Sequence, residues 1–230
     1  MPSEVNLNWQ KTFRVIPSKF PPINFFEELV SPDLMEELFY VENLTNDRLR
    51  DEVGDIFLVP KEDRVSGNGS SVVMASFTHV SRDRTSRFSD GSYGIYYAAR
   101  EVETALRERA FHSERFLSNT KELPGSITMR VYQSKKILKP LLDIRGDLYA
   151  NLQHPTQYAD PQAFGLHVKN SSKWGIVYNS VRHKGGECIA ILRPPAIPLP
   201  VIQTQHFNFV WDGQKIHQAF EIGGEVFDFQ

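Results

Sequence analysis

Residues 175–192 read GIVYNSVRHKGGECIAIL, which is two apolar runs on either side of the pair Gly185-Gly186. Short apolar runs that flank a glycine turn are typical of β-hairpins. We therefore predict a strand at 175–181, a strand at 187–192 and a turn across the two glycines. This hairpin sets the class of fold, because it requires antiparallel pairing within the C-terminal half of the chain.

Two more glycine turns lie downstream, at Asp212-Gly213 and at Gly223-Gly224. Both are bordered by short segments rich in aromatic and β-branched residues, as in a chain of hairpins. The pattern predicts a β-meander over residues 193–230, and hairpins rather than strand–helix–strand units.

Along the rest of the chain, apolar residues recur in some segments at every second position, as in strands, and in others at helical spacing. The further strands predicted in this way are 13–16, 71–77, 94–98, 127–132, 207–211 and 226–229. The predicted helices are one that begins at Ser31-Pro32, one over 101–116, and a short one capped by Asp160-Pro161. Residues 43–69 are predicted to be a loop-rich connection.

These elements predict an α+β fold, a single mixed domain over residues 1–230 without internal repeats. A central β-sheet forms its core at about 14–192, and the meander completes it. A chain of 230 residues with 40% hydrophobic and 12% aromatic residues is long enough for a core of this kind.

The charge balance and the cysteine content narrow the classes of function. The formal net charge is −2, so no chain-wide basic field exists to bind a nucleic acid or an anionic membrane directly. Cys188 is the single cysteine, which excludes an intramolecular disulfide and fits a reducing compartment. The N-terminus lacks the features of a secretory signal, and no segment is apolar enough to span a bilayer. We expect a cytoplasmic protein.

The common catalytic motifs do not occur in the sequence. It contains no phosphate-binding glycine loop, no paired-histidine metal helix and no serine-hydrolase elbow. The seven histidines are scattered without the spacing of metal ligands, so we predict no metal site. Cys188 stands inside an apolar strand, where a lone thiol is expected to be an inert core residue.

Two segments are richer in polar and aromatic residues than the fold requires. Residues 87–99 read RFSDGSYGIYYAA and lead into a helix with the sequence TALRERAF at 104–111, and residues 175–182 read GIVYNSVR. From about Arg14 to Leu192 the chain resembles the RES-domain family of bacterial toxins. That family's pattern has an Arg-aromatic-Ser turn, a strand ending in tyrosine, a helix bearing glutamate, and a later Tyr-x-Ser-x-Arg strand. The region before this turn, with NLTNDRLRDEVGD, is longer here than the family pattern.

The resemblance implies a fold related to ADP-ribosyltransferases and an enzyme that degrades NAD, which is its substrate and not a cofactor. It also implies a toxin–antitoxin system in which the partner is an antitoxin with a helix-turn-helix (Xre-like) domain. On the matching positions, Glu108, Arg87 and Tyr97 are the candidate catalytic residues. Arg87, Tyr97, Ser180 and Arg182 are the candidate residues for binding the substrate.

Cleavage of the nicotinamide–ribose bond suits these residue types. A carboxylate such as Glu108 stabilises an oxocarbenium-like centre, and arginines such as Arg87 and Arg182 form paired hydrogen bonds with a pyrophosphate. Tyr97 could stack on the nicotinamide ring, and Ser180 could bind a ribose or phosphate oxygen. Nicotinamide leaves as a neutral molecule, so no strong general acid is needed.

Each of these residues also has an ordinary structural interpretation. Taken singly, Arg87 reads as a solvated loop residue, Tyr97 as a core aromatic, and Ser180 as a hydroxyl bonded to the backbone. Helical periodicity does not select Glu108 either, because the apolar stripe of its helix centres on Val102, Leu106 and, unexpectedly, Arg109. The joint occurrence of the residues favours the functional interpretation.

Several functions remain open from the residues alone. The acceptor in NAD cleavage is water in a glycohydrolase or inorganic phosphate in a phosphorylase. A protein mono-ADP-ribosyltransferase is a second enzymatic possibility, with Glu101 as a conceivable further acid. A nucleotide-binding module without turnover is the alternative from another class.

Overall fold

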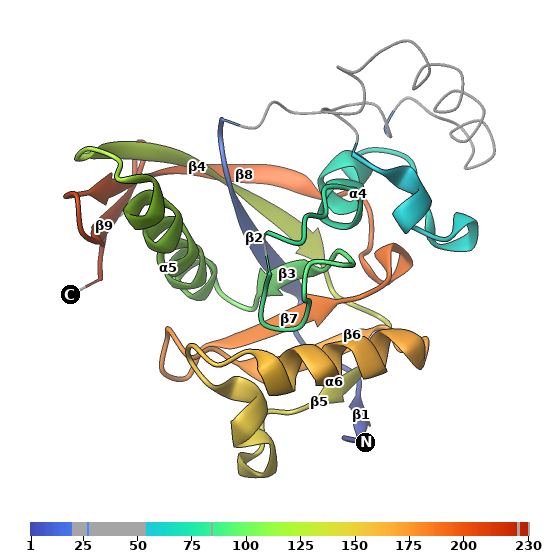
Figure 1. The fold of residues 1–230 in the computed structure, drawn as a ribbon. Coiled ribbons are helices and arrows are strands. Elements are labelled where there is room, and N and C mark those ends of the chain that lie inside the picture. Colours follow the sequence, from blue (N-terminus) through green and yellow to red (C-terminus); the bar gives the residue numbers. More distant parts are fainter. Residues whose placement is uncertain (20–26, 28–53, 84, 225, 230) are drawn as a thin grey trace.

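The computed structural model describes residues 1–19, 27, 54–83, 85–224 and 226–229. Within these residues ten strands form one sheet in the order β1-β5-β6-β7-β3-β2-β4-β8-β9-β10 (Figure 1). The bounds of the strands are β1 (Glu4–Val5), β2 (Lys11–Pro17), β3 (Tyr96–Ala99), β4 (Gly125–Lys135), β5 (Leu141–Asp143), β6 (Gly175–Asn179), β7 (Glu187–Ile191), β8 (Ile202–Trp211), β9 (Ile216–Glu221) and β10 (Val226–Asp228). The predicted mixed α+β domain with a central sheet is confirmed.

Helices cover both faces of this sheet. The described α-helices are α4 (Ser70–Thr78), α5 (Val102–Thr120) and α6 (Ala159–Asn170). Four short 3-10 turns accompany them, namely η1 (Ile56–Leu58), η2 (Lys61–Asp63), η3 (Asp147–Gln153) and η4 (Pro194–Ala196). α5 and α6 share one hydrophobic cluster, and α4 packs with η1 and η4 in another. No helix of the described residues is long and apolar enough to cross a bilayer.

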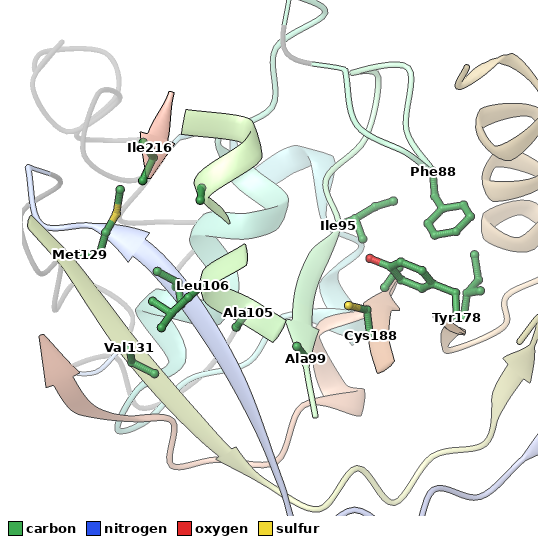
Figure 2. Close-up of a cluster of buried hydrophobic side chains, with 14 of the residues drawn as sticks. Phe88, Ile95, Ala99, Ala105, Leu106, Met129, Val131, Tyr178, Cys188 and Ile216 are labelled. Atoms are coloured by element: carbon green, nitrogen blue, oxygen red, sulfur yellow. The ribbon is translucent and has the colours of Figure 1, made fainter. Parts of the chain in front are cut away.

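The central strands are apolar on both faces, because successive side chains of a strand point in opposite directions. In β7, Cys188 and Ala190 join the cluster under α5 and α6, whereas Ile189 and Ile191 join the cluster under α4. Figure 2 shows the first cluster, in which Leu106 of α5 lies with side chains of β3, β4 and β7.

The predicted hairpins are confirmed. β6 and β7 pair antiparallel with Gly175 opposite Ile191, and the turn between them contains Gly185 at a positive φ of 82°. β8, β9 and β10 form the predicted antiparallel meander. The predicted strands at 13–16, 94–98 and 127–132 and the helix over 101–116 correspond to β2, β3, β4 and α5.

The strand predicted at 71–77 is wrong, because this segment belongs to helix α4. The β-branched pair in SVVMASF favours a strand by propensity. In the fold, however, Ser70, Val73, Met74 and Phe77 are all buried, and their spacing is helical. Tertiary burial along one helical face therefore outweighs local propensity in this segment.

The sheet also contains one strand–helix–strand unit, upstream of the predicted meander, that the sequence patterns did not indicate. β5 and β6 pair in parallel, with Leu142 opposite Ile176, and η3 and α6 form the crossover between them. A parallel pair requires such a crossover, whereas every other strand pair of the described sheet is antiparallel. The helix predicted at Ser31-Pro32 and residues 43–53 of the predicted connection lie outside the described residues.

Candidate active site

A pocket of about 690 Å³ opens between α5 and the sheet. Its walls come from β2, β3, β4, the 85–87 turn and one side of α5, and Tyr178 of β6 and Cys188 of β7 also line it. Such a volume is in the range of sites for small molecules and nucleotides. Arg87, Tyr97 and Glu108 all line this pocket, so the fold brings together the three residues that were predicted to be catalytic.

Glu108 is held by Ser180, which lies directly after β6. The Ser180 hydroxyl donates a hydrogen bond of 2.6 Å to Oε1 of Glu108. The same hydroxyl oxygen accepts hydrogen bonds from the backbone N–H groups of Arg182, at 3.1 Å, and His183, at 3.0 Å. Because its single proton is used on Glu108, Ser180 acts on this carboxylate and does not point a free donor at a substrate.

Tyr97 of β3 is fixed through its phenolic oxygen. That oxygen lies 2.9 Å from Oγ of Ser86 and accepts a hydrogen bond of 3.1 Å from the backbone N–H of Phe88. Burial raises the pKa of Tyr97 to about 12, so its phenol is neutral at pH 7. The tyrosine therefore ties the 85–88 turn to β3 and presents its ring to the pocket.

Arg87 is 6% exposed and contributes to the pocket wall. Its Nη1 donates a hydrogen bond of 2.7 Å to the carbonyl oxygen of His154, and its guanidinium lies 5.2 Å from the centroid of the Tyr158 ring. The segment around η3 thus orients this side chain. The solvated-loop interpretation of Arg87 is wrong, because the residue is buried.

Arg182, like Ser180, does not line the pocket directly. Its guanidinium stacks 3.4 Å from the centroid of the Phe111 ring and donates a hydrogen bond to the carbonyl oxygen of Pro155. Its backbone N–H supports Ser180, and a direct contact with substrate stays a prediction. Glu101, the conceivable second acid, is an exposed residue at the start of α5 and does not line the pocket either.

Further polar and aromatic residues that the sequence patterns did not select also line the pocket, and four of them bear on its chemistry. They are Arg14, Arg109, His112 and Tyr178. The sequence did mark Arg109 as unusual, because a charged side chain is unexpected on the apolar stripe of a helix. Tyr178 also gave a signal, since it precedes Ser180 by two residues and so shares its face of the strand.

The electrostatics of the pocket are governed by its arginines. Burial first and the charge of Arg14 second lower the pKa of Arg109 to about 10, so both guanidinium groups are charged at pH 7. His112 also lines the pocket, and desolvation first and the charge of Arg109 second lower its pKa to about 4. The pocket therefore combines a carboxylate with an excess of positive charge.

Cys188 is 2% exposed, and burial raises the pKa of its thiol well above the usual value. The thiol is thus protonated at neutral pH, as expected for an inert core cysteine. Among the residues that the structure describes, no group of three or more His, Cys, Asp or Glu side chains could hold a metal ion.

This chain is similar to a known family and to two known proteins. The model of the family described as RES domain matches residues 61–212. A protein of Sinorhizobium fredii (strain NBRC 101917 / NGR234), described as uncharacterized protein y4oC, is 31% identical over 219 residues, which are 93% of this chain and 90% of that protein. Among solved structures, a chain of the M. tuberculosis MbcT-MbcA toxin-antitoxin complex is similar in structure. The match covers 51% of this chain and 67% of that chain, with a TM-score of 0.35 and 10% sequence identity. The family match spans the turn, the helix and the strand that shape the pocket, and the chain belongs to the RES domain family.

Proposed function

We propose that this chain is an enzyme that cleaves the nicotinamide–ribose bond of NAD and acts as the toxin of a toxin–antitoxin pair. The observation that carries the enzymatic part is the composition of one pocket. Glu108, oriented by Ser180, faces the same cavity of about 690 Å³ as Arg14, Arg87 and Arg109. A substrate that fits needs an electron-poor centre for the carboxylate and a strongly anionic group for the arginines.

NAD meets both requirements. When the bond between C1′ of the ribose and the ring nitrogen breaks, its electron pair goes to the nitrogen and nicotinamide leaves uncharged. Positive charge develops on the ribose, and the Glu108 carboxylate stabilises it. Water or inorganic phosphate then forms the new bond to C1′, and a water acceptor loses one proton to the solvent. The arginines neutralise the pyrophosphate in the bound substrate.

Tyr97 and Tyr178 form a part of the pocket wall that suits the binding of an aromatic ring. Both present aromatic surface to the pocket, and burial raises the pKa of each hydroxyl, which keeps both rings neutral. Tyr97 has the role of a stacking partner for nicotinamide, as the sequence resemblance implies. Ser180 has the role of positioning Glu108 and not that of binding a ribose or phosphate oxygen.

The test is nicotinamide release from NAD by the purified, partner-free chain, measured by chromatography with and without inorganic phosphate. We expect release by the wild type and a loss of at least about a hundredfold in Glu108→Gln, which keeps the size of the side chain but removes its charge. Glu101→Gln is the matched control, because Glu101 is the residue directly before α5 and 65% of its side chain is exposed. Intact NAD after long incubation with folded wild-type protein would refute the enzymatic proposal.

The products identify the acceptor. Free ADP-ribose indicates water, a phosphorylated ADP-ribose that forms only with phosphate indicates phosphorolysis, and ADP-ribose attached to protein indicates a transferase. Binding of NAD without turnover would indicate a nucleotide-binding module.

The toxin proposal rests on membership of the RES domain family. The resemblance described in the sequence is to bacterial toxins of that family. An unrestrained NAD consumer would harm its own cell, so we propose a cognate antitoxin, with a helix-turn-helix domain, that covers the pocket. Expression of this chain alone should deplete cellular NAD and stop growth, and co-expression with the antitoxin should restore both. Normal growth and NAD levels with abundant folded wild-type protein and no antitoxin would contradict this part of the proposal.

A further inference from the structure

Arg109 and Arg14 both line the pocket, and neither forms an ion pair with another residue that the structure describes. Within the described part of the chain, Arg109 makes no ion pair and no side-chain hydrogen bond, and its buried Nε has no partner. Arg14 donates from Nη1 to the carbonyl oxygen of Tyr97 at 3.0 Å and lies 4.7 Å from the centroid of the Tyr96 ring, but its Nε is also buried without a partner. Both side chains are half-buried, and a buried Nε without a partner is costly, so such a pair favours a ligand that supplies an anion.

The position of the pair within the pocket narrows the choice of anion. Along α5 the lining side chains run from Ala105 through Glu108 and Arg109 to Phe116 and Leu117, about two helical turns beyond Arg109. That far end is mixed in character, because Lys19 lines it with its Nζ 4.9 Å from the centroid of the Phe116 ring, and Glu122 follows Leu117 in the lining. Arg109 therefore lies next to Glu108 on the helix, and an aromatic ring lies further along the pocket.

We propose that Arg109 and Arg14 bind one phosphate group, at a subsite separate from the contacts that hold Arg87. This inference rests on the proposed function for its choice of nucleotide, and it deepens that function by naming the residues that recognise phosphate. The group comes either from the dinucleotide, placed between its reacting ribose and a base toward Phe116, or from free inorganic phosphate beside Glu108. Both sources present the same chemistry to the two guanidinium groups.

The electrostatics support the assignment. Arg14 and Arg109 repel each other closely enough that Arg14 contributes to the lowered pKa of Arg109, after burial. An anion between the two groups removes this repulsion. Arg87 and Arg14 each have one carbonyl oxygen and one tyrosine ring as partners, whereas no such contact holds Arg109 among the described residues.

The experiment measures thermal unfolding and ligand affinity of the full chain with three probes, which are inorganic phosphate, inorganic pyrophosphate and ADP-ribose. The variant is Arg109→Gln, and Arg115→Gln is the matched control, because Arg115 is an exposed arginine on the same helix that does not line the pocket. Without any anion, we expect the unfolding temperature of Arg109→Gln to equal or exceed that of the wild type, since an unpaired charge has been removed. A purely structural role of Arg109 would lower it.

With the probes present, we expect Arg109→Gln to lose at least about tenfold in affinity for one of them, and Arg115→Gln to bind as the wild type does. Loss confined to ADP-ribose or pyrophosphate assigns the subsite to the nucleotide, and loss for inorganic phosphate assigns it to the free ion. If Arg109→Gln binds all three probes as tightly as the wild type does, the subsite proposal is overturned, even if the wild type releases nicotinamide from NAD. Conversely, Arg109-dependent binding without nicotinamide release would refute the proposed enzyme and leave the phosphate subsite in place.

Discussion

Replacement of Ser180 by alanine tests how the carboxylate of Glu108 is held. The change removes a donor 2.6 Å from Oε1 of Glu108 and leaves the lining of the pocket itself unchanged, because Ser180 is not a lining residue. It also removes the acceptor of two backbone N–H groups, those of Arg182 and His183, which lie in the turn between β6 and β7. The substitution therefore affects one carboxylate and one turn.

The size of the effect follows from the charge on Glu108. A hydrogen bond to a charged group contributes about 1.5–3 kcal/mol, and each 1.4 kcal/mol is about tenfold in rate. If the Ser180 hydroxyl fixes Glu108 at the position where the ribose becomes positive, kcat for nicotinamide release should fall about 10- to 100-fold in Ser180→Ala. KM should change little, because Ser180 makes no contact with substrate in the proposed site.

The assay is steady-state nicotinamide release with thermal unfolding measured in parallel. Ser171→Ala is the control, because the Ser171 hydroxyl is exposed and donates only to the His167 carbonyl oxygen one turn back in the helix. A Ser180→Ala protein that is folded and keeps wild-type kcat would refute the positioning role. A rise in KM with unchanged kcat would instead return Ser180 to the role of a substrate ligand.

Three further perturbations give separate predictions. Arg87→Ala should raise KM for NAD more than it lowers kcat, because its proposed partner carries charge in both the ground state and the transition state; unchanged affinity in a titration would reject this role. Leu106→Ala should lower the free energy of unfolding by about 2–5 kcal/mol, because Leu106 is 0% exposed in the cluster under α5; a loss below about 1 kcal/mol in denaturant unfolding would contradict that burial. Hydrogen bonds from Arg145, of 2.9 and 2.6 Å, hold the pKa of Asp143 below its usual value. The folded state thus gains stability from the ionised Asp143 above about pH 4 and loses it as the pH falls further, so Asp143→Asn should be less stable than wild type at pH 7 and should show a smaller loss on acidification.

The hairpins could be predicted from the sequence because their signals are local. The Gly185-Gly186 pair and the turn at Asp212-Gly213 each fix a reversal within a few residues, and the strands on either side carry their own apolar runs. Residues 71–77 show the limit of this approach. Their β-branched residues favour a strand locally. Which of their side chains are buried depends on packing against η1 and η4, and the buried ones have helical spacing.

The candidate site was predictable to the extent that its residues lie in recognisable segments. Arg87, Tyr97 and Glu108 come from one continuous stretch of the chain, and the structure places all three in the pocket wall. Ser180 could be selected as well, but its partner could not, because the contact with Glu108 joins positions 72 residues apart. A sequence pattern identifies such residues and leaves the contacts between them unspecified.

Arg14 illustrates what only the topology can supply. It belongs to β2 near the N-terminus, and it reaches the site because β2 lies between β3 and β4 in the sheet. Nothing near Arg14 in the sequence points to Glu108 or Arg109, which are more than 90 residues away. Once β2 is placed beside β3, the charged residue on the apolar stripe of α5 acquires an explanation, because that side of the helix faces the pocket as well as the core. Arg109 is a charged residue at a position where packing alone favours an apolar one. Its replacement is therefore the best test of whether this side of α5 binds a ligand or only packs in the core.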